Sequence, residues 1–350
     1  MGIAVDTIGN IFIADSNDNV IRMMSRSNGG IISTVAGTGK VGYTGDGGSA
    51  LSANLYAYIG IAVDYSGNIY ISDSNHHVIR MVTKSTGFIT TVAGNGHSGY
   101  SGDSGQATLA SLNIPNGVAV DSWANIYIAD SSNNVIRMVT KSTGVITTIA
   151  GRAFTLGYTG DGGLATAALL NIVMDIVTDS LGNIYLVDSN NYAIRMISEG
   201  DGIITTVAGT GTSGTSGDGG LAVAAKLYKP FGVAVDLDGN IFITDLYQSV
   251  IRMVEKSTGI IQTVAGTGVA GYSGDGGPAA LAQLAYPSGI AVDSYGFIIF
   301  SDTGNSRVRA FTVYTGSDTS SASSISTSYT SLGCPLWCMS VTLLIAMWQL

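Results

Sequence analysis

The stretch GIAVDYSGNIYISDSNHHVIRMV (Gly60–Val82) contains three short apolar runs separated by turn residues. The first run, GIAVD, ends in an Asp that precedes a Gly-Asn pair, which indicates a tight turn between two strands. The second run, NIYISD, and the third, VIRMV, are rich in β-branched and aromatic residues that suit a half-buried strand. The stretch therefore predicts three short strands joined by two turns.

The same plan recurs along the chain at intervals of 57 or 58 residues. GIAVD or a close variant begins at Gly2, Gly60, Gly117, Asp175, Gly232 and Gly289. A Ser-Thr-Gly turn and a fourth run such as ITTVAG complete most units, and four hairpin-linked strands repeated around an axis form the blades of a β-propeller. An open stack of units would need polar caps at both ends. The end units here are as apolar as the middle ones, so we predict a closed ring of six blades.

Gly60–Val82 resembles an NHL repeat, and the resemblance recurs six times between residue 2 and about residue 312. It implies an all-β, six-bladed propeller of the TolB-like or lactonase-like superfamily, with four strands in each blade. The resemblance specifies the fold well and the function poorly, because one propeller architecture carries many unrelated activities.

The two ends of the chain depart from the repeat. The ITTVAG run occurs five times for six copies of the other strands. Either RAFTVY (Arg309–Tyr314) lengthens to serve as the missing strand, or a strand upstream of Met1 closes the ring. Because the sequence starts inside a repeat, we expect a truncated N-terminus, with any secretion signal lost along with it.

The propeller is expected to occupy residues 1–314 and to be followed by a Ser/Thr-rich disordered stalk over 315–335. Residues 336–350 are almost wholly apolar. They fit a glycolipid-anchor signal, a membrane span that has been cut short, or a spurious terminal extension. These features favour an extracellular or cell-surface protein that is attached to the membrane by its C-terminal tail.

Composition excludes several classes of protein. The net charge of −9, and only six lysines with no runs among them, argue against a nucleic-acid partner. Both cysteines, Cys334 and Cys338, fall outside the repeats, so the propeller has neither a disulfide framework nor a cysteine zinc site. Three histidines and two glutamates leave few groups for acid–base catalysis.

Two sets of charged residues recur in every unit. The first is an Asp followed seven positions later by an Arg, which would meet across a hairpin as a structural ion pair. These pairs are Asp15 and Arg22, Asp73 and Arg80, Asp130 and Arg137, Asp188 and Arg195, Asp245 and Arg252, and Asp302 and Arg309. The second set ends each first strand and comprises Asp6, Asp64, Asp121, Asp179, Asp236 and Asp293. It is interpreted as turn-forming, and the alternative is a converging set of Ca²⁺ ligands.

The motif GYSGDGG (Gly271–Gly277) has four relatives earlier in the chain, each placed after a fourth strand and before an Ala/Leu-rich piece. We interpret it as an inter-blade connector, with its Asp as the N-cap of a short helical turn. No Lys follows to make a phosphate loop. The adjacent tyrosines, Tyr43, Tyr100, Tyr158 and Tyr272, are candidate ligand-binding residues.

In a repeat protein, residues that form a functional site are expected to differ from the residues at equivalent positions of the other units. The departures are Trp123, Arg152, Phe154, Leu156, Met174, Asp175, Thr178, Lys226, Tyr228, Lys229, Leu246, Tyr247 and Gln248, of which Trp123 and Tyr247 are ligand-binding candidates. The preferred hypothesis is a non-catalytic binding propeller that presents loops to a protein or glycan partner, with no cofactor. The alternative is a lactonase-like metal-dependent hydrolase or lyase at the central channel, with Asp175 and Asp236 among its ligands and Ca²⁺ as its cofactor.

Overall fold

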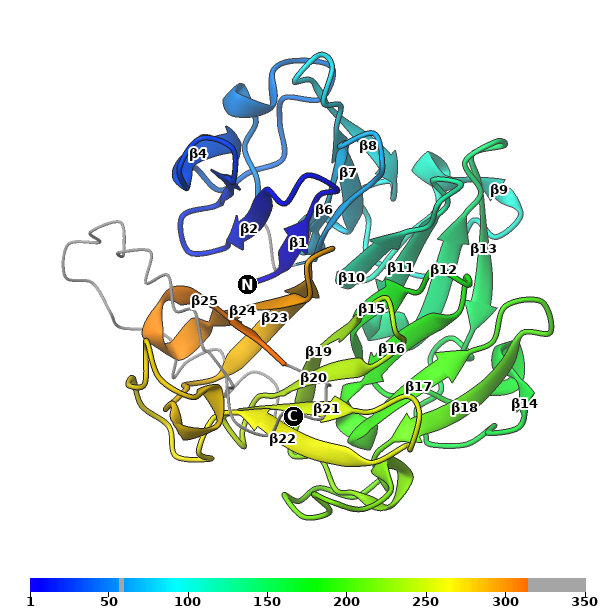
Figure 1. Cartoon of the computed structure of the whole chain (residues 1–350). Helices are drawn as coiled ribbons and strands as arrows, with labels where there is room; N and C mark the ends of the chain where they lie inside the picture. The colour runs from blue at the N-terminus through cyan, green and yellow to red at the C-terminus, as the bar shows by residue number, and fades with distance from the viewer. Residues whose placement is uncertain (57–59, 314–350) are drawn as a thin grey trace.

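The computed structural model describes residues 1–56 and 60–313, which form six antiparallel sheets arranged around a common axis (Figure 1). The predicted all-β, six-bladed propeller is therefore confirmed. The predicted stalk (315–335) and apolar tail (336–350) lie outside the described residues, and the boundaries between these parts remain predictions. In the described part of the chain, no helix is long and apolar enough to cross a membrane.

The first three blades run from β1 to β13. Blade 1 contains β1 (Ile3–Val5), β2 (Ile11–Asp15), β3 (Val20–Ser25) and β4 (Ile31–Ala36). Blade 2 contains β5 (Ile61–Val63), β6 (Ile69–Asp73), β7 (Val78–Val82) and β8 (Ile89–Ala93). Blade 3 contains β10 (Pro115–Val120), β11 (Ile126–Asp130), β12 (Val135–Val139) and β13 (Val145–Ala150), with the short strand β9 (Gly105–Gln106) at its outer edge.

The last three blades follow the same order. Blade 4 contains β15 (Val173–Thr178), β16 (Ile184–Asp188), β17 (Ala193–Ile197) and β18 (Ile203–Ala208), with β14 (Gly163–Leu164) at its outer edge. Blade 5 contains β19 (Pro230–Val235), β20 (Ile241–Asp245), β21 (Val250–Val254) and β22 (Ile261–Ala265). Blade 6 contains β23 (Pro287–Val292), β24 (Phe297–Asp302) and β25 (Arg307–Thr312).

Blade 6 has three strands among the described residues, so the expectation of four strands holds for the other five blades. Arg309–Thr312 belongs to β25, which pairs with β24 as the third strand of the blade. The suggestion that this segment serves as the fourth strand is therefore wrong. The ring closes where β1 lies beside β23, and the backbone N–H of Gly289 donates to the Met1 carbonyl at 3.1 Å (Figure 1).

The core lies between neighbouring blades. One face of each sheet packs on the next sheet, so that Tyr70 of blade 2 shares a cluster with Val118 of blade 3, and Tyr127 of blade 3 shares another with Ile176 of blade 4. Alternation along each strand sends Ile and aromatic side chains into these layers. Each blade therefore depends on its neighbours for burial, as in other repeat architectures.

The disc has two faces. On the loop face, the first strand of each blade begins and the second strand turns into the third. On the turn face, the Asp-x-x-Gly-Asn turn joins the first two strands and the Ser-Thr-Gly turn joins the last two. The antiparallel register fixes this arrangement, because Ile61 pairs with Ile71 and Val63 pairs with Ile69 in blade 2.

The inter-blade loops cover the outer edge of the following blade. β9, in the loop after blade 2, pairs with β13 of blade 3, and β14 pairs in the same way with β18 of blade 4. Each loop ends in a single 3-10 turn: η1 (Ala50–Ser52), η3 (Ala107–Leu109), η5 (Ala165–Ala167), η7 (Ala222–Ala224) and η8 (Ala279–Leu281). Further 3-10 turns form hairpins on the loop face: η2 (Ser74–His76), η4 (Ser131–Asn133), η6 (Ser189–Asn191) and η9 (Thr303–Asn305).

The short helical turns were predicted, but their N-caps were not predicted correctly. The cap residue of η1 is Ser49 and that of η5 is Leu164, and neither makes a side-chain cap hydrogen bond. The Asp of the GYSGDGG-type motif lies upstream and reaches instead to the arginine of the next blade. In blade 2, Asp46 Oδ1 accepts from Arg80 Nη2 at 2.6 Å. The motif is an inter-blade connector, as predicted, with an ion pair in place of a helix cap.

Candidate functional site

Five of the six repeated arginines bridge two aspartates, whereas Arg252 pairs with Asp218 alone and the predicted pair with Asp245 does not form. The hairpin pairs form as predicted in five blades, with N···O distances of 3.0 Å for Arg22–Asp15, 3.7 Å for Arg80–Asp73, 3.5 Å for Arg137–Asp130, 3.4 Å for Arg195–Asp188 and 3.1 Å for Arg309–Asp302. The closer partners are loop aspartates, at 2.6 Å for Arg80–Asp46, 2.7 Å for Arg137–Asp103, Arg195–Asp161 and Arg309–Asp275, and 2.5 Å for Arg252–Asp218. Apart from the partly exposed Arg22, these guanidinium groups are buried and paired with carboxylates, which favours a structural role.

The tyrosines of the connector motif lie over the same arginines. The Arg80 guanidinium carbon is 5.2 Å from the centre of the Tyr43 ring, and Arg137 lies 4.9 Å from Tyr100. The hydroxyl groups of Tyr43, Tyr100 and Tyr158 each hydrogen-bond a threonine of the next blade, at 2.7–2.9 Å. Tyr272 lies over Arg307 and Arg309 and donates to Asp275. In the structure these tyrosines make contacts that hold the blades together. Their part in ligand binding remains a prediction.

The second aspartate ring forms turns. Asp121 Oδ1 accepts the backbone N–H groups of Trp123 and Asn125, at 2.9 and 2.8 Å, and Asp121 Oδ2 accepts the amide of Asn125 at 2.8 Å. Asp6, Asp64, Asp179 and Asp236 bond their own turns in the same way, and Asp293 does so without the Asn. The geometry supports the turn interpretation. In residues 1–56 and 60–313, no three His, Cys, Asp or Glu side chains gather as a metal site would require.

The histidines also serve the hairpins. His76 replaces the Asn of other units, and its Nδ1 lies 2.7 Å from Asp73 Oδ1. His77 Nδ1 accepts the backbone N–H of Ile114, in the loop that enters blade 3, at 3.2 Å. The first contact fixes the blade 2 hairpin and the second joins blades 2 and 3, which favours a structural role for both rings.

Blade 5 departs from this hairpin pattern. In blades 3 and 4, an Asn amide donates to the hairpin Asp at 2.8 Å, as Asn133 does to Asp130. Blade 5 has Gln248 in that position, and its amide instead points to the carbonyl of Thr215. Asp245 therefore accepts only the backbone N–H of Tyr228 among the hydrogen bonds of the described residues. Burial raises the pKa of Asp245 to about 7.

Replacing Gln248 by Asn is expected to stabilise the protein by about 1.5 kcal/mol at pH 8, because a restored amide donor favours the ionised Asp245. Since the native pKa of Asp245 lies above its ordinary value of 3.8, native stability falls as the pH rises from about 4 to about 7. The gain should therefore be smaller at pH 5, where Asp245 is protonated in the native state. Urea unfolding at pH 5 and pH 8 measures this difference, and equal gains at both pH values would rule the explanation out.

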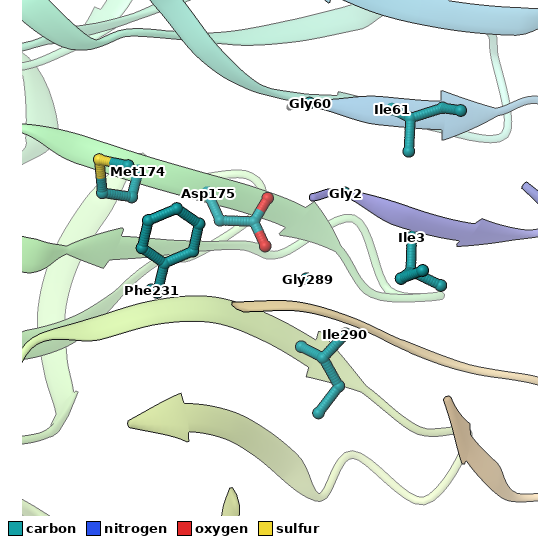
Figure 2. Close-up of a pocket in the computed structure, with 9 residues that line it drawn as sticks. All are labelled: Gly2, Ile3, Gly60, Ile61, Met174, Asp175, Phe231, Gly289 and Ile290. Carbon is teal, nitrogen blue, oxygen red and sulfur yellow. The ribbon is translucent and has the colours of Figure 1, made fainter. Parts of the chain in front are cut away.

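The central channel opens widely on the turn face and narrows on the loop face. Its main cavity has a volume of about 490 Å³ and is lined by the first strands of all six blades. At the loop-face end, Met174, Asp175 and Phe231 leave a space of only about 30 Å³ (Figure 2). Glycine occupies the position of Asp175 in the other units, because a Cβ there would collide with the next blade. Such an atom on Gly232 would lie 2.3 Å from the Ser288 carbonyl oxygen.

The Asp175 carboxylate points into the channel at this narrow end (Figure 2). Its two carboxylate oxygens accept the backbone N–H groups of Ile176 at 2.9 Å and of Val233, in the next blade, at 3.1 Å. Burial raises the pKa of Asp175 to about 6. Asp236, its proposed fellow ligand in the enzymatic alternative, follows the first strand of blade 5 and lies at the turn face. The structure therefore does not bring Asp175 and Asp236 together.

Several residues that break the repeat do converge on the loop face of blades 4 to 6. Tyr228 and Tyr247 meet edge to face, with ring centres 5.5 Å apart. Burial raises the pKa of Tyr247, and the nearby phenols of Tyr228, Tyr286 and Tyr192 raise it further. Lys229 donates to Asn190 Oδ1 of blade 4, and burial lowers the pKa of Lys229. We call Asn190, Tyr192, Tyr228, Lys229, Tyr247 and Tyr286 the loop-face cluster.

Sequence reasoning identified part of this cluster. Tyr228, Lys229 and Tyr247 are among the predicted departures from the repeat. Asn190, Tyr192 and Tyr286 are not among them. Tyr192 fills a hairpin slot held by His or Asn in blades 2 and 3, and Tyr286 fills the slot before Pro that holds Ile114 in blade 3. Comparing the units slot by slot would have found both. Trp123, the other candidate, lies on the opposite face.

The architecture defines a class of protein, the six-bladed β-propeller, with non-repeated aromatic residues on one face. Solved structures of this fold include a protein from Bacteroides thetaiotaomicron (TM-score 0.63, 22% identity, covering 88% of this chain and 68% of that one). A streptogramin B lyase (TM-score 0.51, 16% identity, 90% and 83% coverage) shares it too. At these identities the likeness shows the fold alone.

The family follows from the sequence comparisons. A family profile described as the teneurin NHL domain matches residues 94–157 and 210–273. The chain is 28% identical over 326 residues to protein SUPPRESSOR OF QUENCHING 1, chloroplastic, of Arabidopsis thaliana, covering 90% of this chain and 30% of that protein. It is 30% identical over 290 residues to teneurin-1 of Gallus gallus, covering 71% and 10%. This chain is an NHL-repeat β-propeller, and it spans less than a third of the length of these two relatives.

Proposed function

We propose that this propeller is a non-catalytic recognition module that binds a protein or glycan partner through the loop-face cluster. The observation that carries the proposal is how the polar side chains are used. The repeated arginines, aspartates and tyrosines of the blades are engaged with one another. The loop-face cluster instead leaves three tyrosine side chains about 40% exposed, next to a partly buried lysine.

Exposed tyrosines beside a lysine suit recognition. Tyrosine offers a large, rigid contact surface at little cost in conformational entropy, and it is enriched among the residues that dominate binding energy. The cluster is also held firmly. Leu246 and Tyr247 donate their backbone N–H groups to the carbonyls of Lys229 and Tyr228, at 3.1 and 3.3 Å. Pre-organisation of this kind reduces the entropy lost on binding.

Location outside the cell, with the polar stretch as a spacer and the apolar tail as an attachment, belongs to the same proposal. The net charge of −9 is consistent with a role that involves no nucleic acid.

The double substitution Tyr228→Ser with Tyr247→Ser is expected to weaken partner binding at least about tenfold, because aromatic anchors commonly contribute about 2 kcal/mol or more each. The probes are a printed library of oligosaccharides and a displayed peptide library, with the full chain as the analyte. The matched control is Tyr65→Ser with Tyr295→Ser, which removes two exposed tyrosines from the turn face. Equal losses in both variants, or no specific binding by the wild type, would overturn the proposal.

The enzymatic alternative has a single supporting observation, the Asp175 carboxyl at the channel axis with its raised pKa. A pKa near 6 suits a general acid or base. Its nearest polar contacts are backbone N–H groups, so a second catalytic group would have to come from the substrate or a cofactor. Turnover that is lost in Asp175→Asn would favour this alternative over the recognition module.

A further inference from the structure

The turn face carries a ring of six large apolar side chains around the channel mouth. One is contributed by the Asp turn of every blade, and we call the set the apolar crown. Its members are 60–79% exposed and comprise Ile8, Tyr65, Trp123, Leu181, Leu237 and Tyr295. All six project to the outside, and Tyr295 alone among them lies beside a cation of the neighbouring blade in the described residues, with the Arg26 guanidinium carbon 4.0 Å from the centre of its ring.

The crown is held rigidly. In each turn, the Asp carboxylate accepts two backbone N–H groups, as Asp179 does from Leu181 at 2.9 Å and from Asn183 at 2.8 Å. The six turns repeat around one ring, and the crown residue follows the Asp directly in blades 2 and 5 and by two positions in the other blades. The result is one exposed apolar side chain from each blade around the channel mouth. Large apolar side chains gathered on one exposed face mark an interaction surface, and a ring on one face of a disc suits a flat partner.

The composition of the crown and the charges around it suit the surface of a neutral bilayer. Trp and Tyr favour the membrane–water interface, where Leu and Ile can insert more deeply. Apart from the turn aspartates, the turn face carries Arg26, Lys84, Lys141 and Lys256 against Glu199, Asp201, Asp238 and the half-buried Glu255. The turn aspartates are already engaged in hydrogen bonds. Hydrogen bonding does not remove the charge of these carboxylates, so the turn face is net acidic. It therefore offers no attraction to anionic lipid, which leaves apolar insertion into a zwitterionic surface as the driving force.

The path of the chain agrees with this orientation. β25 runs from the loop face to the turn face and ends at Thr312, so the described part of the chain ends on the side of the crown. The sequence beyond contains the apolar run Leu336–Leu350. An apolar segment connected to this face would bring the crown, and not the loop-face cluster, toward a membrane.

We propose that the turn face rests on a phospholipid bilayer, with the apolar crown inserted at the interface and the loop-face cluster pointing away from it. The partner is the zwitterionic bilayer surface itself. This proposal concerns a different face from the recognition site, and it stands whether or not that site binds a glycan or protein.

Trp123 is the natural reporter, because Trp337 and Trp348 are the only other tryptophans. In the full chain carrying Trp337→Phe and Trp348→Phe, we expect phosphatidylcholine vesicles to shift the Trp123 emission to the blue. Phosphatidylcholine with brominated acyl chains should quench it. The matched control adds Trp123→Phe and Tyr228→Trp, which moves the reporter to the loop face and should remain unquenched. An unquenched Trp123, or equal quenching of both reporters, would overturn the proposal.

The second measurement removes crown side chains without touching the reporter. Leu181→Ser with Leu237→Ser should lower the quenching of Trp123 and reduce vesicle partitioning about tenfold or more, because two inserted apolar side chains are lost. Partitioning should persist in 0.5 M salt, roughly the regime in which surface charge attraction is screened. An unchanged urea midpoint verifies that the variant folds. Crown-dependent dimers in sedimentation, without vesicle binding, would assign the crown to a second copy of the chain and refute the bilayer proposal.

Discussion

Replacing Arg195 by Met is expected to lower the free energy of unfolding by about 3–5 kcal/mol. The guanidinium is fully buried and bonds Asp161 of the preceding loop and Asp188 of its own hairpin, at 2.7 and 3.4 Å. Met fills a similar volume but leaves the fully buried Asp188 without its cation. An unpaired buried carboxylate costs far more than the lost contact itself. Urea unfolding at pH 7 measures the loss.

The control is Arg22→Met in blade 1. Arg22 is 21% exposed, and it pairs with Asp15 and with Asp18 of its own hairpin instead of a loop aspartate. Its loss should therefore cost about 1 kcal/mol or less. Adding Asp188→Asn to Arg195→Met should recover part of the stability, since it removes the unpaired charge. Similar losses for Arg22→Met and Arg195→Met would show that the inter-blade pair has no special weight.

Replacing Gly160 by Ala, in the connector motif between blades 3 and 4, is expected to cost about 3 kcal/mol. The residue has φ of +98°, and a Cβ there would lie 2.7 Å from the Cα of Ala168 in the same loop. The loop would have to open, and opening it would draw Asp161 away from Arg195. Thermal or urea unfolding would report the loss as a lower midpoint with an unchanged fold.

Gly162, two residues further on, provides the comparison. It also has a positive φ, of +77°, but a Cβ there would have nothing within 4 Å. Gly162→Ala should therefore cost about 1 kcal/mol, from backbone strain alone. If the two alanine variants are equally unstable, close packing of the connector does not explain the glycine at position 160.

The fold was predictable because every unit repeats the same local signals. Turns that begin with Asp, with Gly-Asn at their end in four of the six units, strands rich in Ile and Tyr, and a spacing of 57 or 58 residues leave few architectures open. The hairpin pairing of Asp188 with Arg195 was also predictable, since a seven-residue separation spans one tight hairpin. The three strands of blade 6 were harder to predict, because the number of strands in a blade depends on which segment pairs with β25.

Longer-range contacts could not be predicted. Asp161 lies 34 residues before Arg195, and only the path of the connector over the next blade brings them together. Read alone, an Asp after Gly and before an Ala-rich piece favours a helix cap. The loop-face cluster could not be predicted for the same reason. Tyr192, Tyr228 and Tyr286 come from three successive blades, and only the curvature of the ring brings them together.

Each inter-blade connector contacts the blade that follows it in the sequence, and this order affects how the chain can fold during translation. Each connector is made before the blade that it clamps, so its aspartate is already in place when the matching arginine leaves the ribosome. A blade can then complete its ion pairs as soon as its own third strand is synthesised, without waiting for later sequence. Assembly can therefore proceed from the N-terminus in step with translation, one blade after another.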